Sequence, residues 1–155
     1  DLSVFLFFGL TGTIGTYFLQ THIWTAATLL PASGCGFLSV AVLNLNNLRD
    51  IDNDRKSGKN SIPVRIGKTL GFYYQKGLLV AGVICFSIYP LFQTIPVHKN
   101  QNLVLLLGYY PIMLMIRELN EKMTPAEIDP YLKKTALRTL LLILVFGMTQ
   151  VFLSR

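Results

Sequence analysis

Three oxygen-bearing side chains in one polar stretch, residues 44–61, have a spacing that suits metal chemistry. Asn46, Asp50 and Asp54 follow one another at intervals of four residues. On a helix this interval places the three side chains on one stripe, about one turn apart, whereas Asp52 falls on the opposite side. Mg²⁺ prefers oxygen ligands and is often bound by one or two carboxylates together with substrate phosphates. The spacing is therefore that of half a site for a hard divalent cation.

Cationic side chains surround the two carboxylates, namely Arg49, Arg55, Lys56, Lys59 and Arg65. Carboxylates interleaved with Arg and Lys suit a magnesium-diphosphate group, because the metal bridges phosphate oxygens and the basic groups take up the remaining charge. Asn44, Asn46 and Asn47 directly follow an apolar run, at a depth where polar groups are costly and tend to be functional. Charge runs are also common in solvated loops, so the spacing alone leaves a plain surface loop as the alternative.

The residues on either side of this stretch have the composition of an integral membrane protein. Hydrophobic residues make up 52% of the 155 residues, and charged residues only 14%, against about 25% charged residues in a typical soluble domain. The net charge of +6 does not indicate nucleic-acid binding, because the basic residues are clustered between apolar runs, as loop charges of membrane proteins are. We therefore expect an all-α, polytopic helix bundle in a lipid bilayer, with no nucleic-acid partner.

Five apolar segments are long enough, or nearly so, to cross a bilayer as helices of roughly 20 residues. They cover about residues 2–19, 25–48, 70–94, 103–116 and 136–153. The fourth segment is the shortest. Gly9, Gly12 and Gly15 along the first segment would let a neighbouring helix approach closely. Polar connections cover residues 49–69 and 117–135, and the Asn/Asp stretch lies at the junction of the second segment with the first connection.

The basic residues orient these segments. All but two of the 14 Lys and Arg residues flank the two polar connections, and the opposite side has only Lys99 and Arg155. The positive-inside rule therefore places both connections in the cytoplasm. We expect the two aspartates to lie at the cytoplasmic mouth of the bundle.

A long motif runs from Asn46 to Gly67 and reads Asn-Asn-x-Arg-Asp-x-x-x-Asp-x-x-x-Gly-Lys, followed by Val-Arg-x-Gly. It resembles the second aspartate-rich motif of the UbiA superfamily of intramembrane prenyltransferases. Within that family it is most similar to the group that prenylates 1,4-dihydroxy-2-naphthoate in menaquinone synthesis. The length of the motif makes the resemblance specific, as two aspartates four residues apart would not be.

The resemblance implies nine membrane helices, with two aspartate-rich motifs that face each other across a central cavity. The five segments of residues 1–155 would then be the C-terminal part of one prenyltransferase domain, helices five to nine. A start at Asp1 rather than at a methionine agrees with a piece of a longer chain. The first motif would lie in an N-terminal half of the same protein, so this piece alone is expected to be inactive.

The resemblance also implies roles for individual residues. Asp50 and Asp54 would be the catalytic carboxylates that bind Mg²⁺. The substrate-binding residues would be Asn46, Asn47, Arg49, Lys59 and Arg65. The implied enzyme transfers a polyprenyl group from polyprenyl diphosphate to 1,4-dihydroxy-2-naphthoate and releases diphosphate and carbon dioxide to give demethylmenaquinol. Its active site would lie at the cytoplasmic face of a bacterial inner (plasma) membrane.

Three other functions stay open on the sequence alone. One is a prenyltransferase of the same family with another aromatic acceptor, such as 4-hydroxybenzoate, homogentisate or haem. Another is half of a transporter in which Asp50 and Asp54 bind the transported ion, although that class expects acidic groups near the bilayer midplane between broken helices. The third is a structural membrane subunit, which would leave the ordered Asn/Asp stripe unexplained.

Overall fold

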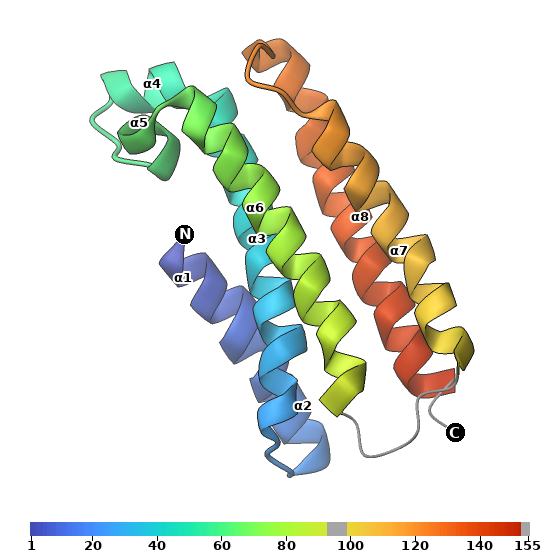
Figure 1. Ribbon diagram of the computed structural model, residues 1–155. Helices are drawn as coiled ribbons and strands as arrows, with labels where there is room; N and C mark the ends of the chain where they lie inside the picture. Colours follow the sequence, from blue (N-terminus) through green and yellow to red (C-terminus); the bar gives the residue numbers. More distant parts are fainter. Residues whose placement is uncertain (93–98, 153–155) are drawn as a thin grey trace.

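The computed structural model describes residues 1–92 and 99–152, and these residues form helices joined by short connections (Figure 1). In chain order the elements are α1 (Leu2–Val4), the π-helix η1 (Phe5–Thr11), α2 (Gly12–Thr21), the 3₁₀ turn η2 (Ala26–Thr28), α3 (Leu29–Arg49), α4 (Ile51–Lys56), α5 (Ile62–Ile66), α6 (Lys68–Ile88), the 3₁₀ turn η3 (Tyr89–Phe92), α7 (Lys99–Glu118) and α8 (Pro125–Phe152). No strand occurs in the described residues, so the predicted all-α class is confirmed.

Four stretches of helix in the described residues are long and apolar enough to cross a membrane: Leu2–Thr21, Ala26–Arg49, Lys68–Phe92 and Pro125–Val151. Each overlaps a predicted segment, although residues 93, 94 and 153 of those segments lie outside the described residues. The predicted segment 103–116 lies within α7, which is not one of the four. Its helix begins with Lys-Asn-Gln-Asn and ends with Arg-Glu, and these polar ends shorten the apolar stretch between them.

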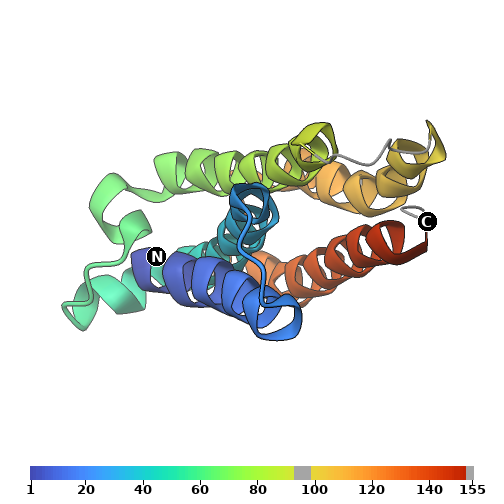
Figure 2. The same ribbon diagram turned by 90° about the horizontal axis from the view of Figure 1, so that it is seen from below.

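The helix α3 is central in the bundle (Figures 1 and 2). It packs along α6, along α8 and along η1, which is part of the first helix, the continuous stretch Leu2–Thr21 made of α1, η1 and α2. The helix α7 packs mainly against α8. Buried side chains of α3, α6, α7 and α8 form one continuous apolar core, with Leu38, Leu45, Leu79, Ile112 and Leu142 each 0% exposed. The polar stretch at the end of α3 is thus positioned by the best-packed helix of the molecule.

The polar connections are shorter and more helical than the hydropathy pattern indicated, although residues 124–127 also have the sequence pattern of a helix start. Residues 49–69 contain α4 and α5, and α8 begins at Pro125 rather than near residue 136. The start of α8 is a capping box. The backbone N–H and the hydroxyl of Thr124 donate to the Glu127 carboxylate at 2.6 and 2.9 Å, and the Glu127 N–H donates to the Thr124 hydroxyl oxygen at 3.3 Å. This pairing satisfies N–H groups of the first turn, and Pro125 at the first helical position has no N–H to satisfy.

A buried polar contact joins α3 to α6. The Asn44 and Gln75 side chains are 0% exposed, and Asn44 Nδ2 donates to Gln75 Oε1 at 2.9 Å and to the Gly71 carbonyl at 3.2 Å. Replacing either residue by leucine leaves its partner buried without that bond. We therefore expect Asn44→Leu and Gln75→Leu each to destabilise the protein, with a coupling in the double variant of about 0.6 kcal/mol, the average found between membrane helices.

Denaturant unfolding of the purified full-length protein, compared among wild type, the two single variants and the double variant, measures this coupling. Strictly additive effects would contradict the contact between the two amides.

Candidate functional site

Asp50 lies at a bend between α3 and α4. Its backbone angles (φ −96°, ψ 11°) depart from those of a regular helix. Helical hydrogen bonding nevertheless continues through the bend, because the Asp50 N–H donates to the Asn46 carbonyl at 3.0 Å and the Asp54 N–H donates to the Asp50 carbonyl at 2.8 Å. Asn46, Asp50 and Asp54 therefore lie on successive turns, but on a bent stripe rather than the straight one that the spacing predicts.

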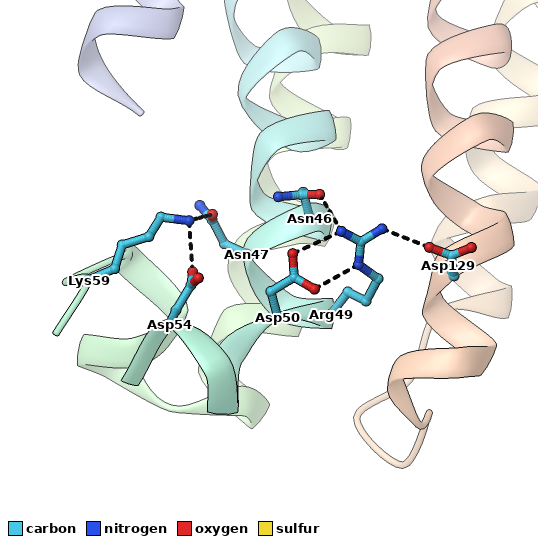
Figure 3. A network of polar contacts seen from close by, with 7 residues as sticks. All are labelled: Asn46, Asn47, Arg49, Asp50, Asp54, Lys59 and Asp129. Atoms are coloured by element: carbon cyan, nitrogen blue, oxygen red, sulfur yellow. Dashed lines mark hydrogen bonds and ion pairs between the residues drawn. The ribbon is translucent and has the colours of Figure 1, made fainter. Parts of the chain in front are cut away.

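Arg49 forms hydrogen bonds to three other polar side chains, and these four residues make up the Arg49 group (Figure 3). Its Nε and Nη2 donate to the two carboxylate oxygens of Asp50, both at 2.8 Å, and Nη2 also donates to Asn46 Oδ1 at 2.9 Å. Its Nη1 donates to Asp129 Oδ1 at 2.7 Å. The hydrogen bonds from Arg49 hold the pKa of the Asp50 carboxyl below its usual range, so Asp50 is ionised at neutral pH.

Lys59 forms hydrogen bonds to two other polar side chains, and these three residues make up the Lys59 group (Figure 3). Its Nζ lies 2.9 Å from Asp54 Oδ2 and 3.1 Å from Asn47 Oδ1. Gly58 directs the chain back toward α4: it has a φ of 74°, which glycine adopts without steric cost, and the next N–H, that of Lys59, donates to the Asp54 carbonyl at 2.9 Å. The Asp54 side chain is only 10% exposed, so this carboxylate is more buried than that of Asp50, which is 30% exposed.

Six of the seven predicted site residues belong to these two groups, and Arg65 does not. Arg65 lies on α5 and is exposed, but it lines a cleft of about 390 Å³ together with Asn47, Lys59 and the loop that joins α4 to α5. The cation of Arg65 thus shares a space with Lys59 without contacting the aspartates.

Asp129 was not among the residues predicted from the sequence, and it completes the Arg49 group from the first turns of α8. It is 80 residues from Arg49 in the chain. The capping box at Thr124 is a signal that places Asp129 at the start of a helix, but no local pattern indicates its partner. Asp129 and Arg49 line an open cleft of about 570 Å³ with Asp50, Asp52 and Asn53, so Asp52, predicted to point away, borders the same space.

The two groups contain three carboxylates and two cations, which leaves a formal charge of −1. In the part of the chain that the structure describes, no three His, Cys, Asp or Glu side chains converge as a complete metal site would require. Asp50 and Asp54 fit a partial site, because Mg²⁺ is commonly held by one or two carboxylates, with phosphate oxygens and waters as its other ligands. The arrangement is thus suited to a divalent cation that binds together with a phosphate-bearing molecule.

An apolar groove of about 530 Å³ begins beside this polar site. Its lining comes from the first helix, α3 and α8, namely Val4, Phe8, Ser39, Val42, Leu43, Asn46 and Leu132. Asn46 belongs both to the groove and to the Arg49 group. A molecule with a charged head and a long apolar tail could therefore contact both at once.

Comparison with known proteins gives one family and a set of relatives. The model of the UbiA prenyltransferase family matches residues 1–129. The chain is 37% identical over 155 residues to the 1,4-dihydroxy-2-naphthoate octaprenyltransferase of Escherichia coli, covering all of this chain and 49% of that protein. It is 38% identical over 151 residues to the protein of the same name from Haemophilus influenzae, covering 96% of this chain and 47% of that protein.

A shorter match, 40% identical over 89 residues, is to the 1,4-dihydroxy-2-naphthoate octaprenyltransferase of Mycobacterium tuberculosis, and it covers 57% of this chain and 30% of that protein. The chain spans about half the length of the first two of these relatives. No solved structure matches the chain.

Proposed function

The chain belongs to the UbiA prenyltransferase family, and from this we propose that the protein transfers a polyprenyl group to 1,4-dihydroxy-2-naphthoate. The donor is polyprenyl diphosphate, and the products are demethylmenaquinol, diphosphate and carbon dioxide, a step of menaquinone biosynthesis. The observation that carries the proposal is the pair of charge groups around Asp50 and Asp54 at the end of α3, beside an apolar groove. The names of the relatives support the naphthoate as acceptor.

Asp50 and Asp54 would hold Mg²⁺, which would supply positive charge to stabilise the departing diphosphate. Arg49 and Lys59 hold the two carboxylates in place before the substrate arrives, so little reorganisation is needed during the reaction. Arg65 and Lys59 line a common cleft and add positive charge for the departing diphosphate. Asn46 and Asn47 fix the cations through their side-chain oxygens.

The bond changes follow from this charge distribution. The C–O bond electrons leave with the diphosphate, and the allyl group becomes carbocation-like. The electron-rich ring of the acceptor attacks it at the carbon that bears the carboxylate, and a C–C bond forms. Loss of that carboxylate as carbon dioxide returns an electron pair to the ring and restores its aromaticity.

The apolar groove supports a long prenyl chain as donor. Its lining is mostly hydrocarbon and includes Asn46, whose side-chain oxygen accepts a hydrogen bond from Arg49. A prenyl chain that lies in the groove would therefore place its diphosphate beside the charged groups around Arg49 and Lys59. Because a polyprenyl group is insoluble in water, a site bordered by the bilayer is the place where such a donor is available.

The whole protein is proposed to contain an N-terminal half with a second aspartate-rich motif that completes the magnesium site. The relatives, about twice as long as this chain, support that proposal. We place the completed site at the cytoplasmic face of a bacterial plasma membrane, because Arg49, Lys59 and Arg65 are at the basic ends of the helices. An ion-transporting half is disfavoured, since Asp50 and Asp54 lie at a helix end beside these cations rather than between broken helices.

Membranes that contain the full-length protein, supplied with Mg²⁺, radiolabelled polyprenyl diphosphate and 1,4-dihydroxy-2-naphthoate, test this function. We expect a lipid-soluble labelled naphthoquinol that is lost on addition of EDTA, and no labelled product with 4-hydroxybenzoate or homogentisate. Turnover with one of those acceptors in place of the naphthoate would contradict the proposed acceptor. Absence of product with every aromatic acceptor would contradict the proposed reaction.

A further inference from the structure

The ion pair between Arg49 and Asp129 connects the end of α3 with the start of α8 at the edge of the proposed active site. Most ion pairs at a protein surface contribute little, because solvent screens them and flexible side chains lose entropy. This one differs at its Arg49 end. The guanidinium is already fixed by the bidentate contact with Asp50 and by Asn46, all at 2.8–2.9 Å, so forming the contact to Asp129 restricts little additional motion.

The backbone at the Asp129 end is anchored as well, and the Asp129 side chain, which is 62% exposed, extends from it toward Arg49. The capping box at Thr124 sets the start of α8, and Ile128, beside Asp129, is 0% exposed in the core. The connection before α8 is tied to α6, because Lys68 Nζ donates to the Met123 carbonyl at 2.6 Å. Asp129 is therefore presented to Arg49 by a well-anchored helix start, not by a loose loop.

The division of the guanidinium between two carboxylates has an electrostatic consequence. If Arg49 paired with Asp50 alone, the pair would be neutral. With Asp129 as a second partner, one positive charge is shared by two carboxylates, and the group keeps a formal charge of −1 while Asp50 stays held by two hydrogen bonds. A held but incompletely neutralised carboxylate attracts a divalent cation more strongly than a neutral pair does.

We propose that Asp129 is a positioning residue that shares Arg49 with Asp50 and so keeps Asp50 oriented and available to Mg²⁺ in the presence of diphosphate. The inference rests on the proposed function, because that function supplies the metal and the diphosphate. Asp129 acts through Arg49 and does not itself bind the metal. Partners that orient metal ligands typically change metal affinity or activity by 10- to 100-fold when they are replaced.

The test uses the full-length protein in detergent and two measurements. The first is calorimetric binding of Mg²⁺ in the presence of inorganic diphosphate, and the second is the Mg²⁺ concentration that gives half-maximal prenyl transfer. Asp129→Ala and Asp129→Asn should each weaken Mg²⁺ binding and raise the Mg²⁺ requirement about tenfold, because both remove the charge. Asp129→Glu, which restores the carboxylate, should recover most of the wild-type affinity.

Two further variants separate positioning from a general loss of charge. Asp52→Asn removes one negative charge from the same cleft; the Asp52 side chain is exposed, and its Oδ1 lies 3.8 Å from Arg55 Nη1. This variant should change the Mg²⁺ requirement less than twofold. In an Arg49→Gln background, adding Asp129→Ala should have almost no further effect, because Asp129 acts through Arg49.

Wild-type Mg²⁺ affinity in Asp129→Ala, or equal losses in Asp129→Asn and Asp52→Asn, would overturn the inference. The binding measurement keeps its failure distinct from that of the proposed function. Weaker Mg²⁺ binding in Asp129→Ala, in a protein that fails to prenylate the naphthoate, would support the role of Asp129 and contradict only the proposed acceptor.

Discussion

Replacing Asp50 or Asp54 by alanine in the full-length protein should lower the rate of prenyl transfer by about 10²- to 10³-fold. Stabilisation of a leaving group by a bound metal amounts to several kcal/mol, and each 1.4 kcal/mol corresponds to a factor of ten in rate. Both carboxylates are held by cations in the structure, Asp50 by Arg49 and Asp54 by Lys59. Removing either one deletes an oriented metal ligand and also leaves its cation without that partner.

The measurement is kcat/KM for polyprenyl diphosphate at saturating Mg²⁺ and acceptor. Asp52→Ala is the matched control, since Asp52 lies between the two aspartates in the sequence, is exposed and is 3.8 Å from Arg55; its activity should stay within twofold of wild type. Asp54→Asn keeps the shape of the more buried side chain, so a loss in this variant reflects the missing charge rather than misfolding. Product formation that survives both alanine substitutions would mean that the stretch is a solvated loop.

The sequence located the polar site because polar residues that directly follow an apolar run stand out in a membrane protein. Asn46, Asp50 and Asp54 are on successive turns, as their spacing predicts. The spacing does not predict the bend at Asp50, because the rule assumes a straight helix. The bend and the return of the chain at Gly58 divide the predicted stripe into two groups, one around Arg49 and one around Lys59.

Asp129 could not be predicted from the sequence for a different reason. Its contact with Arg49 spans 80 residues, and it exists because α8 packs against α3. The hydropathy pattern favoured a polar connection up to residue 135, whereas the capping box shows that a membrane-spanning helix can begin well before its apolar part. A capping signal just before a polar turn is therefore informative about the helix start even where the hydropathy is low.

The glycines of the first helix show how far a small-residue rule can be applied. The rule predicted a close approach of a neighbouring helix, and the structure confirms it at Gly9, where a Cβ atom would lie 2.6 Å from the Gly36 Cα of α3. A Cβ built at Gly15 has no atom of the described residues within 4 Å, apart from its chain neighbours and the nearby backbone of its own helix. Gly15 follows Gly9 by six residues, which is not a whole number of helical turns, so the two glycines do not share a face of the first helix.

Replacing Gly9 by alanine should therefore destabilise the protein by about 2–3 kcal/mol, near the upper end of the usual cost of overpacking. The three atoms nearest to the added methyl group would all be backbone atoms, the Gly36 Cα at 2.6 Å, the Ala32 carbonyl oxygen at 2.8 Å and the Gly36 nitrogen at 2.9 Å. Backbone atoms of a central helix cannot turn aside as a side chain can, so the first helix must move away from α3. The Gly36→Ala variant should cost less, because its methyl group would meet the movable ring of Phe5.

Gly15→Ala is the control on the same helix, and it should be neutral or stabilise the protein by up to about 1 kcal/mol, since alanine favours helix and its methyl group would meet no other helix among the described residues. Unfolding of the purified full-length protein in a denaturing detergent, followed by circular dichroism, measures all three variants. Opposite signs for Gly9→Ala and Gly15→Ala would show that contact with α3, rather than helix propensity, determines the effect. Equal changes in both variants would contradict the close packing of the first helix on α3. This packing also matters for the proposed site, because the first helix and α3 both line the apolar groove beside Asn46.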